Sequence, residues 1–225
     1  MPLSFLQFCN PAILQLPCII SAVIPAIVLA AGKSTRMGRP KANLPIEDGE
    51  TFLSRIVRTF YDAAVPDVVV VVGHDAEAVV TAFSVTGAAA RFVMNPDYES
   101  GQLSSLIKGL NAVDRPGVAA ALVTLVDVPL VAASTVRAVV DRYRQTHAPI
   151  VRPVRGDAHG HPVLIDRSLF DEIRRADPTA GAKLVVRAHT SAAGDVEVDD
   201  DGAFLDIDTV AEYERVVGRD DRQNF

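Results

Sequence analysis

An alternation of apolar runs and helical patterns along most of the 225-residue chain is the feature that most restricts its fold. Short apolar runs rich in β-branched residues have the composition of buried strands, and they span residues 24–29, 67–72, 91–95 and 119–126. The segments that follow them place apolar side chains at helical spacing, and they span residues 51–64, 75–83, 103–113 and 134–143. Repetition of strand and helix predicts a parallel sheet with right-handed crossovers.

The rhythm changes after Pro149. The stretches IVRPV and HPVLI are separated by RGDAHG, which predicts a β-hairpin inserted at the edge of the sheet. Further helices are expected near 168–175 and 181–189, a strand near 195–198, and a last helix from Thr209 to Val217. The fold class expected is therefore α/β, with a single doubly wound, mostly parallel sheet and an inserted β-hairpin.

The domain boundaries follow from the same pattern. Residues 23–218 are expected to form one domain, residues 1–22 a weakly ordered extension, and residues 219–225 a solvated tail. The apolar run over residues 11–31 has no Lys or Arg ahead of it and is interrupted by Pro11, Pro17 and Pro25, which disfavours a signal peptide or a membrane span. Both cysteines lie in the first eighteen residues without metal-ligand spacing, which favours a reduced, cytoplasmic setting.

The stretch LAAGKSTRMGRPKANLP follows the first expected strand and concentrates positive charge in a chain of net charge −6. Its four cations are Lys33, Arg36, Arg39 and Lys41. Gly32 and Gly38 allow the backbone to approach a ligand closely and to turn its N–H groups toward an anion. Because ligands of an open parallel sheet bind at the carboxyl ends of its strands, this loop is a candidate phosphate site in which Arg36 and Lys41 neutralise phosphate oxygens.

Two other phosphate motifs and one class of ligand are excluded. A Walker A loop needs a glycine where this chain has Ile27, and the spacing from Gly32 to Gly38 does not fit the G-x-G-x-x-G dinucleotide fingerprint. The isoelectric point near 5.3 argues against a broad nucleic-acid surface, which would need a basic face. A small anionic ligand remains compatible with the local charge of the loop.

An acidic residue ends the most apolar run, AAALVTLVDVPL. A carboxylate that follows a buried strand needs a cation or a hydrogen-bond donor, so Asp127 is a candidate Mg²⁺ ligand. Asp206 and Asp208 in FLDIDTVAEY are two residues apart and share a face of an extended segment, so either can supply a second ligand. Asp208 or Thr209 can instead cap the last helix.

The cationic stretch resembles the signature loop of the MobA-like nucleotidyltransferases, whose general form is LAAGxSxRMGxPKxxLP. The resemblance extends over about residues 24–217 and implies a Rossmann-like nucleotidyltransferase fold in which the loop wraps a nucleoside triphosphate. It implies catalytic roles for Lys41, Arg36 and Asp127, and it favours Asp208 over Asp206 as the second Mg²⁺ ligand. The nucleotide-binding residues that it implies are Leu29, Ala30, Ala31, Gly32, Ser34, Arg36, Lys41, Gly101, Ser104 and Ser105.

Two further segments suggest the substrates. Ala31 gives the loop the form LAAG rather than the LAGG of guanylyl enzymes, and NPDYESGQLSSLIKGL resembles the base-recognition segment of cytidylyl enzymes. The hairpin residues Gly160, His161 and Pro162 resemble the segment that faces the pterin in molybdenum cofactor cytidylyltransferases. The resemblance thus implies transfer of CMP from CTP to molybdopterin with Mg²⁺ as cofactor, a recipient molybdoenzyme as a further partner, and no nucleic-acid or membrane partner.

Three alternatives stay open at this point. A related nucleotidyltransferase can use GTP or another acceptor. An oxidoreductase of the same family can act on a small heteroaromatic compound, although the G-x-G-x-x-G fingerprint is absent. A non-catalytic protein can carry a pterin cofactor to a molybdoenzyme, although retention of Arg36, Lys41 and Asp127 argues for catalysis.

Overall fold

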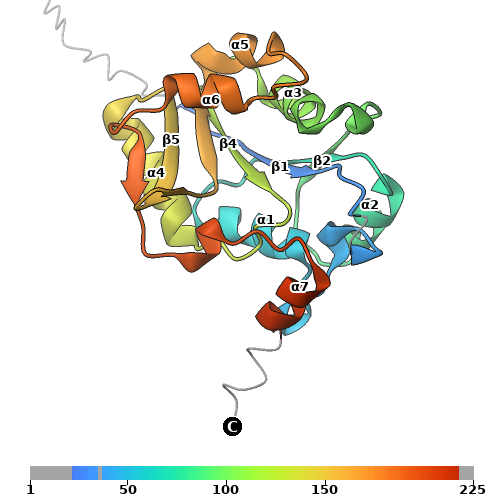
Figure 1. The fold of residues 1–225 in the computed structure, drawn as a ribbon. Coiled ribbons are helices and arrows are strands. Elements are labelled where there is room, and N and C mark those ends of the chain that lie inside the picture. The colour runs from blue at the N-terminus through green and yellow to red at the C-terminus, as the bar shows by residue number, and fades with distance from the viewer. Residues whose placement is uncertain (1–21, 35–36, 218–225) are drawn as a thin grey trace, which may run out of the picture.

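The structure, a computed structural model, describes residues 22–34 and 37–217. One eight-stranded sheet lies between two layers of helices (Figure 1). The strands are β1 (Ala26–Ala30), β2 (Val68–Val72), β3 (Arg91–Met94), β4 (Ala120–Leu125), β5 (Ile150–Arg155), β6 (Ala158–His159), β7 (Val163–Asp166) and β8 (Asp195–Glu197). The helices are α1 (Phe52–Asp62), α2 (Ala76–Ser84), α3 (Gln102–Val113), α4 (Ala133–Thr146), α5 (Phe170–Arg174), α6 (Lys183–His189) and α7 (Val210–Val217). All but the last residue of the expected extension over residues 1–22, and the whole tail over 219–225, lie outside the described residues.

Apolar side chains on both faces of the central strands build two core layers. In β2 every residue is a buried valine, and successive valines point to opposite faces, as the pleat requires. On one face the sheet packs against α1, α2 and α4, and on the other against α3, α5 and α6 (Figure 1). This two-layer burial confirms the predicted doubly wound α/β fold.

The strand pairing places a change of winding direction beside β1. The order is β3-β2-β1-β4-β7-β5-β6, with β8 paired to β5, and β1, β2, β3 and β4 are mutually parallel. The chain therefore winds outward from β1 to β3 and then returns to the other side of β1. Neighbouring parallel strands whose connections leave in opposite directions open a crevice at their carboxyl ends.

The predicted hairpin is present and extends the sheet beyond β4. Its return strand β7 is antiparallel to both β4 and β5, with Val163 opposite Val123 and Leu164 opposite Val151. The outer side of β5 is covered by β8, which runs parallel to it. The hairpin thus extends the sheet on the β4 side of the crevice.

A charge cluster links α3 and α5 on one face of the sheet. Asp114, directly after α3, accepts hydrogen bonds from Arg167 and Arg174, at 2.8 and 2.7 Å, and Arg174 belongs to α5. The hydrogen bond from Arg174, with that from Arg167, outweighs burial and lowers the pKa of Asp114. A lowered carboxyl pKa stabilises the fold above the ordinary aspartate pKa, and this contribution is lost as the pH falls through the folded-state pKa.

Asp114→Asn is therefore expected to lower the free energy of unfolding by about 1 kcal/mol at neutral pH and by much less near about pH 3. Urea unfolding at the two pH values measures this difference. Asp141→Asn is the matched control, because Asp141 pairs with Arg144 on the exposed side of α4. Equal effects of the two substitutions at neutral pH would contradict the prediction.

Candidate active site

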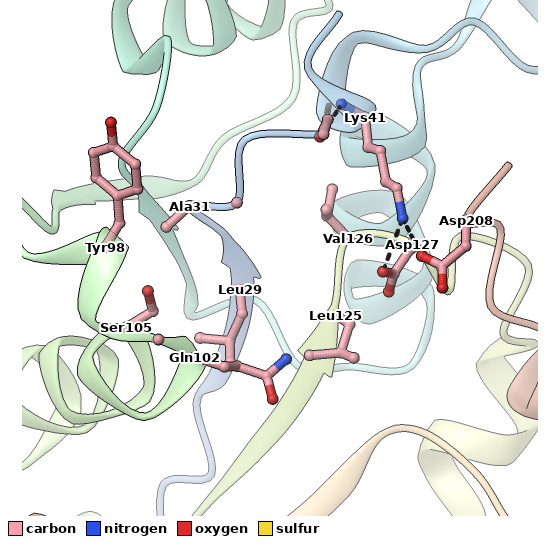
Figure 2. Close-up of a pocket in the computed structure, with 13 residues that line it drawn as sticks. Leu29, Ala31, Lys41, Tyr98, Gln102, Ser105, Leu125, Val126, Asp127 and Asp208 are labelled. Atoms are coloured by element: carbon pink, nitrogen blue, oxygen red, sulfur yellow. Dashed lines mark hydrogen bonds and ion pairs between the residues drawn. The ribbon is translucent and has the colours of Figure 1, made fainter. Parts of the chain in front are cut away.

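A pocket of about 300 Å³ opens at the crevice between the carboxyl ends of β1 and β4 (Figure 2). It is lined by Leu29, Ala31, Gly32, Ser34, Lys41, Tyr98, Gly101, Gln102, Ser105, Leu125, Val126, Asp127 and Asp208. Segments far apart in the sequence thus meet at this point: the loop after β1, the start of α3, the end of β4 and the segment before α7. Most of the residues that the sequence singled out are in this list.

The loop after β1 curls so that its lysine returns to the pocket. The backbone N–H of Lys41 donates to Ser34 Oγ at 3.1 Å, and residues 41–43 form one 3₁₀ turn. Leu29 and Ala31 line the pocket, whereas Ala30 between them points into the core on the α1 side of the sheet. Arg36 lies outside the described residues. The loop therefore brings Lys41, and with it Gly32 and Ser34, to the crevice.

Lys41 lies between two carboxylates. Its Nζ is 3.1 Å from Asp127 Oδ2 and 2.5 Å from Asp208 Oδ1 (Figure 2). The exposed fractions of the three side chains are 11% for Lys41, 21% for Asp127 and 46% for Asp208. Asp127 Oδ1 is buried and has no hydrogen-bond partner among the described residues. A buried carboxylate oxygen of this kind is stabilised by a further cation or donor.

Packing of one isoleucine determines how the two acidic residues before α7 are presented. Ile207 is fully buried in a small apolar cluster with Leu44 and Phe52, and its N–H donates to the Asp127 carbonyl oxygen at 2.8 Å. In an extended segment, Asp206 and Asp208 therefore face away from this cluster. The helix cap is made by Thr209 and Glu212, since the Glu212 carboxylate accepts from the N–H groups of Asp208 and Thr209, at 2.9 Å each.

The carboxylates suit a hard divalent cation that keeps other ligands. No group of three or more His, Cys, Asp or Glu side chains in the described part of the chain could hold a metal ion. Mg²⁺ is commonly held by one or two carboxylates together with substrate phosphates and water, which fits Asp127 and Asp208. Burial, followed by the negative charge of Asp127, raises the pKa of the third acid, Asp206. Of the two candidates for the second ligand, Asp208 lines the pocket and Asp206 does not.

The opposite side of the pocket is formed by the start of α3. Gly101, at φ 109°, begins this helix, and Tyr98 and Gln102 flank it (Figure 2). Ser105 is buried and lines the pocket, whereas the Ser104 hydroxyl donates to the carbonyl oxygens of Asp97 and Gly101 and does not line it. Backbone N–H groups at a helix start, with hydroxyl and amide groups beside them, can bind the edge of a base.

Buried Asn95 organises this side of the pocket, and the sequence analysis did not single it out. Its Nδ2 donates to both Ser104 Oγ and Ser105 Oγ at 2.9 Å, and its Oδ1 accepts from the Asp97 N–H at 3.1 Å. A polar residue that directly follows a strand is the signal that could have identified it. Tyr98 and Gln102, also unforeseen, are positioned by this loop. Tyr98 lies so close to Gly73 that a Cβ on Gly73 would be 2.7 Å from the Tyr98 Cβ.

A second and larger cavity, of about 740 Å³, shares Leu29, Gln102 and Leu125 with the first. Gly160 and His161 of the hairpin line it. His161 Nδ1 lies 3.5 Å from the Val123 carbonyl oxygen, and burial lowers the pKa of the ring, so the imidazole is neutral at neutral pH. The buried Pro162 instead lines a small void against α1 and α4 on the opposite face.

Within residues 22–34 and 37–217, no helix is long and apolar enough to cross a membrane.

The chain is 30% identical over 211 residues to the nicotine blue oxidoreductase of Paenarthrobacter nicotinovorans, with 90% of this chain and 98% of that protein covered. It is 30% identical to a probable molybdenum cofactor guanylyltransferase of Mycolicibacterium paratuberculosis over 77% of this chain and 83% of that protein.

A solved structure has the same fold. The crystal structure of Rv0371c from Mycobacterium tuberculosis H37Rv aligns with a TM-score of 0.74 at 30% identity, covering 88% of this chain and 98% of the other. A second crystal structure of Rv0371c is a complex with manganese. The family model of the MobA-like NTP transferase domain matches residues 26–193, the region that carries the cationic loop, Asp127 and the hairpin. The chain belongs to the MobA-like NTP transferase domain family.

Proposed function

We propose that the protein transfers CMP from CTP to the terminal phosphate of molybdopterin and releases pyrophosphate. The observation that supports this best is Lys41, held between Asp127 and Asp208 at the crevice between β1 and β4. A nucleotidyl transfer brings two anionic phosphates together, and a preorganised cation beside metal-binding carboxylates serves that reaction. The chemistry of transfer follows from the family, and the base and acceptor are the new elements of the proposal.

In the proposed reaction an oxygen of the acceptor phosphate attacks the α-phosphorus of CTP. The new phosphorus–oxygen bond forms as the bond to the bridging oxygen of the β-phosphate breaks, and pyrophosphate carries away that electron pair. Lys41 lowers the repulsion between the two anions, and Arg36 is proposed to do the same from the loop. The N–H groups of the loop at Gly32 and Ser34 orient the triphosphate. Bound Mg²⁺, held by Asp127 and Asp208, would neutralise charge on the phosphates.

Each substrate is assigned to one of the two cavities. The pocket lined by Leu29, Ala31, Gly101 and Ser105 holds the nucleotide. The larger cavity, with Gly160 and His161, holds the pterin end of the acceptor. Ser104 and Pro162 support these surfaces from behind, since neither lines a cavity that takes a substrate.

Cytidine is favoured by the methyl group of Ala31, which lines the nucleotide pocket on the same side as Tyr98 (Figure 2). A side chain at this position reduces the room for a purine. Incubation with each of the four NTPs, Mg²⁺ and molybdenum cofactor, followed by pyrophosphate measurement, tests the assignment. Turnover of CTP is the expected result, and turnover of GTP alone would overturn the choice of base while leaving transfer intact.

Ala31→Gly is expected to raise the ratio of GTP to CTP turnover about tenfold, because removing one methyl group relaxes discrimination by 1–3 kcal/mol at most. Values of kcat/KM for the two nucleotides measure the ratio. Ala30→Gly is the matched control, since it frees the neighbouring backbone equally while its side chain points into the core. An unchanged ratio in Ala31→Gly would show that another residue selects the base.

A second candidate function follows from the similarity to the nicotine blue oxidoreductase. The larger cavity has an apolar floor that suits a flat heteroaromatic ring, which could be reduced with NAD(P)H as the hydride donor. Hydride transfer makes no evident use of a lysine between two carboxylates, so the nucleotidyl reaction is preferred. Oxidation of NAD(P)H in the presence of a heteroaromatic dye, without pyrophosphate release from any NTP, would favour the second candidate.

A further inference from the structure

The wall of the larger cavity that lies away from the nucleotide pocket is cationic. Its floor is the α3-side face of the sheet and is apolar; it comprises Leu103, Leu106, Val123, Val163 and Ile165. Beyond this floor stand Arg152 of β5 and Lys183 and Arg187 of α6. The described lining residues include no Asp or Glu. In a chain of net charge −6, such a surface indicates an anionic ligand.

Arg152 is the most buried of these cations. Its side chain is 13% exposed, and its Nε donates to Asp195 Oδ1 at 2.9 Å. Asp195 is the register partner of Arg152 in the parallel pair of β5 and β8, so the ion pair is fixed by the sheet. Within the described residues the terminal Nη groups of Arg152 donate no hydrogen bond. A guanidinium held in this way can offer both Nη groups to an anion in the cavity.

Lys183 and Arg187 add charge without a structural partner. They are four residues apart on α6 and so share one face of the helix. The buried Val185 anchors the helix to the core. Neither forms an ion pair with any described residue. Both therefore contribute to the field of the cavity and remain exposed.

The register of the sheet gives the span between the two charged ends. Val123 pairs with Val163, and Val151 pairs with Leu164, so Arg152 lies level with Val163 and two strands from β4. Two strand spacings correspond to roughly 10 Å across the sheet, and the four residues from Val123 to Asp127 add about 13 Å along β4. Asp127 follows β4 at the carboxyl end, next to the nucleotide pocket. A ligand that reaches both ends is thus about 16 Å long, which requires a fused ring system with an extended phosphate-bearing arm.

We propose that Arg152, oriented by Asp195, binds a second anionic group of a flat heteroaromatic acceptor whose phosphate is directed to Lys41 and Asp127. The acceptor ring lies on the apolar floor, and the acceptor carries two negative groups rather than one. The inference rests on the proposed function for the direction of the phosphate. Arg152 binds substrate, whereas Asp195 is a positioning residue.

A binding experiment tests the inference without any turnover. The nucleotide pocket is first saturated with Mg²⁺ and a non-hydrolysable CTP analogue, and quenching of the fluorescence of pterin-6-carboxylate is then measured. Saturable binding to the unmodified protein is expected, and Arg152→Gln is expected to weaken it about 10- to 100-fold, the range of one charge-assisted hydrogen bond. Pterin without the carboxylate is expected to bind at least about tenfold more weakly than the carboxylate.

Arg155→Gln is the matched control. Arg155 lies on the same strand, pairs with Asp201 and stacks on Phe204, and it does not line the cavity. Its substitution is expected to leave probe binding unchanged. Because Arg152→Gln also removes an internal ion pair, the double substitution Lys183→Gln/Arg187→Gln on exposed positions provides a second test. It is expected to weaken the probe severalfold with no change in thermal stability.

Kinetics of CMP transfer separate binding from a merely structural role. Arg152→Gln is expected to raise the acceptor KM about tenfold or more with a smaller change in kcat and an unchanged KM for CTP; Arg152→Lys is expected to recover part of the loss. Equal affinity of the probe for the unmodified protein and Arg152→Gln, or absence of saturable binding, would overturn the inference. Arg152-dependent probe binding without transfer from any NTP would instead sustain the anion site at Arg152 and defeat the proposed function, and with it the direction of the phosphate.

Discussion

Lys41→Met is expected to lower the turnover of nucleotidyl transfer by about 100- to 1000-fold, the usual effect of removing one preorganised charge stabiliser. Methionine nearly preserves the length and packing of the buried side chain and removes the positive charge. The phosphates of the two substrates would then approach without the cation that the loop supplies. The fall should be mainly in kcat, because the charge matters most where the phosphates come together.

The same substitution is expected to change how the protein responds to Mg²⁺. Without Lys41, Asp127 and Asp208 repel each other across the position that Nζ now occupies, 3.1 and 2.5 Å from their oxygens. A divalent cation can relieve that repulsion, so Mg²⁺ should raise the thermal stability of Lys41→Met more than that of the unmodified protein. Turnover should stay low even where stability is recovered.

Lys33→Met is the control for Lys41→Met. Lys33 belongs to the same loop but is exposed and pairs with Glu99 at the rim of the pocket. Its loss is expected to reduce kcat less than about fivefold, since exposed charges contribute little. If Lys41→Met retained more than about a tenth of the turnover, Lys41 would be a structural counterion of the carboxylates rather than a catalytic group.

The overall fold could be predicted because its signals are local. The five consecutive valines of β2 indicate a buried strand, and the apolar spacing in α1 indicates a helix, each within a few residues. The order of such elements implies a parallel sheet. Asp127 was recognisable for the same reason, as a single charge at the end of an apolar run. Successive side chains at the end of β1 alternate between the two faces, so Leu29 and Ala31 line the pocket and Ala30 points away from it. The motif resemblance alone assigned all three residues to nucleotide binding.

The remaining site details depend on contacts between distant segments. The position of Asp208 follows from burial of Ile207 beside Phe52 and from its hydrogen bond to Asp127, eighty residues earlier in the sequence. Which of the two serines of α3 faces the pocket is set by Asn95 and the loop carbonyls. No local pattern carries this information, so the sequence could not separate these cases.

Asp127→Asn is expected to reduce Mg²⁺-dependent turnover on the order of 1000-fold while the fold is retained. The amide has nearly the same volume as the carboxylate, its oxygen can still accept from Lys41, and the backbone bond from Ile207 to the Asp127 carbonyl is unaffected. The substitution removes the negative charge that attracts a divalent cation. The buried Oδ1, which has no partner among the described residues, then no longer serves as a charged metal ligand. Titration of activity with Mg²⁺ and of binding with Mn²⁺ measures the effect.

Comparison of the three acidic residues makes this test specific. Asp208→Asn should also weaken Mn²⁺ binding, whereas Asp206→Asn should retain more than about a tenth of the turnover, because Asp208 lines the nucleotide pocket and contacts Lys41 whereas Asp206 does not line it. If Asp206→Asn were as severe as Asp127→Asn while Asp208→Asn was mild, the second ligand would be Asp206. Full activity in Asp127→Asn would remove Asp127 from the metal site, and the pairing of Lys41 with Asp127 would then be only structural.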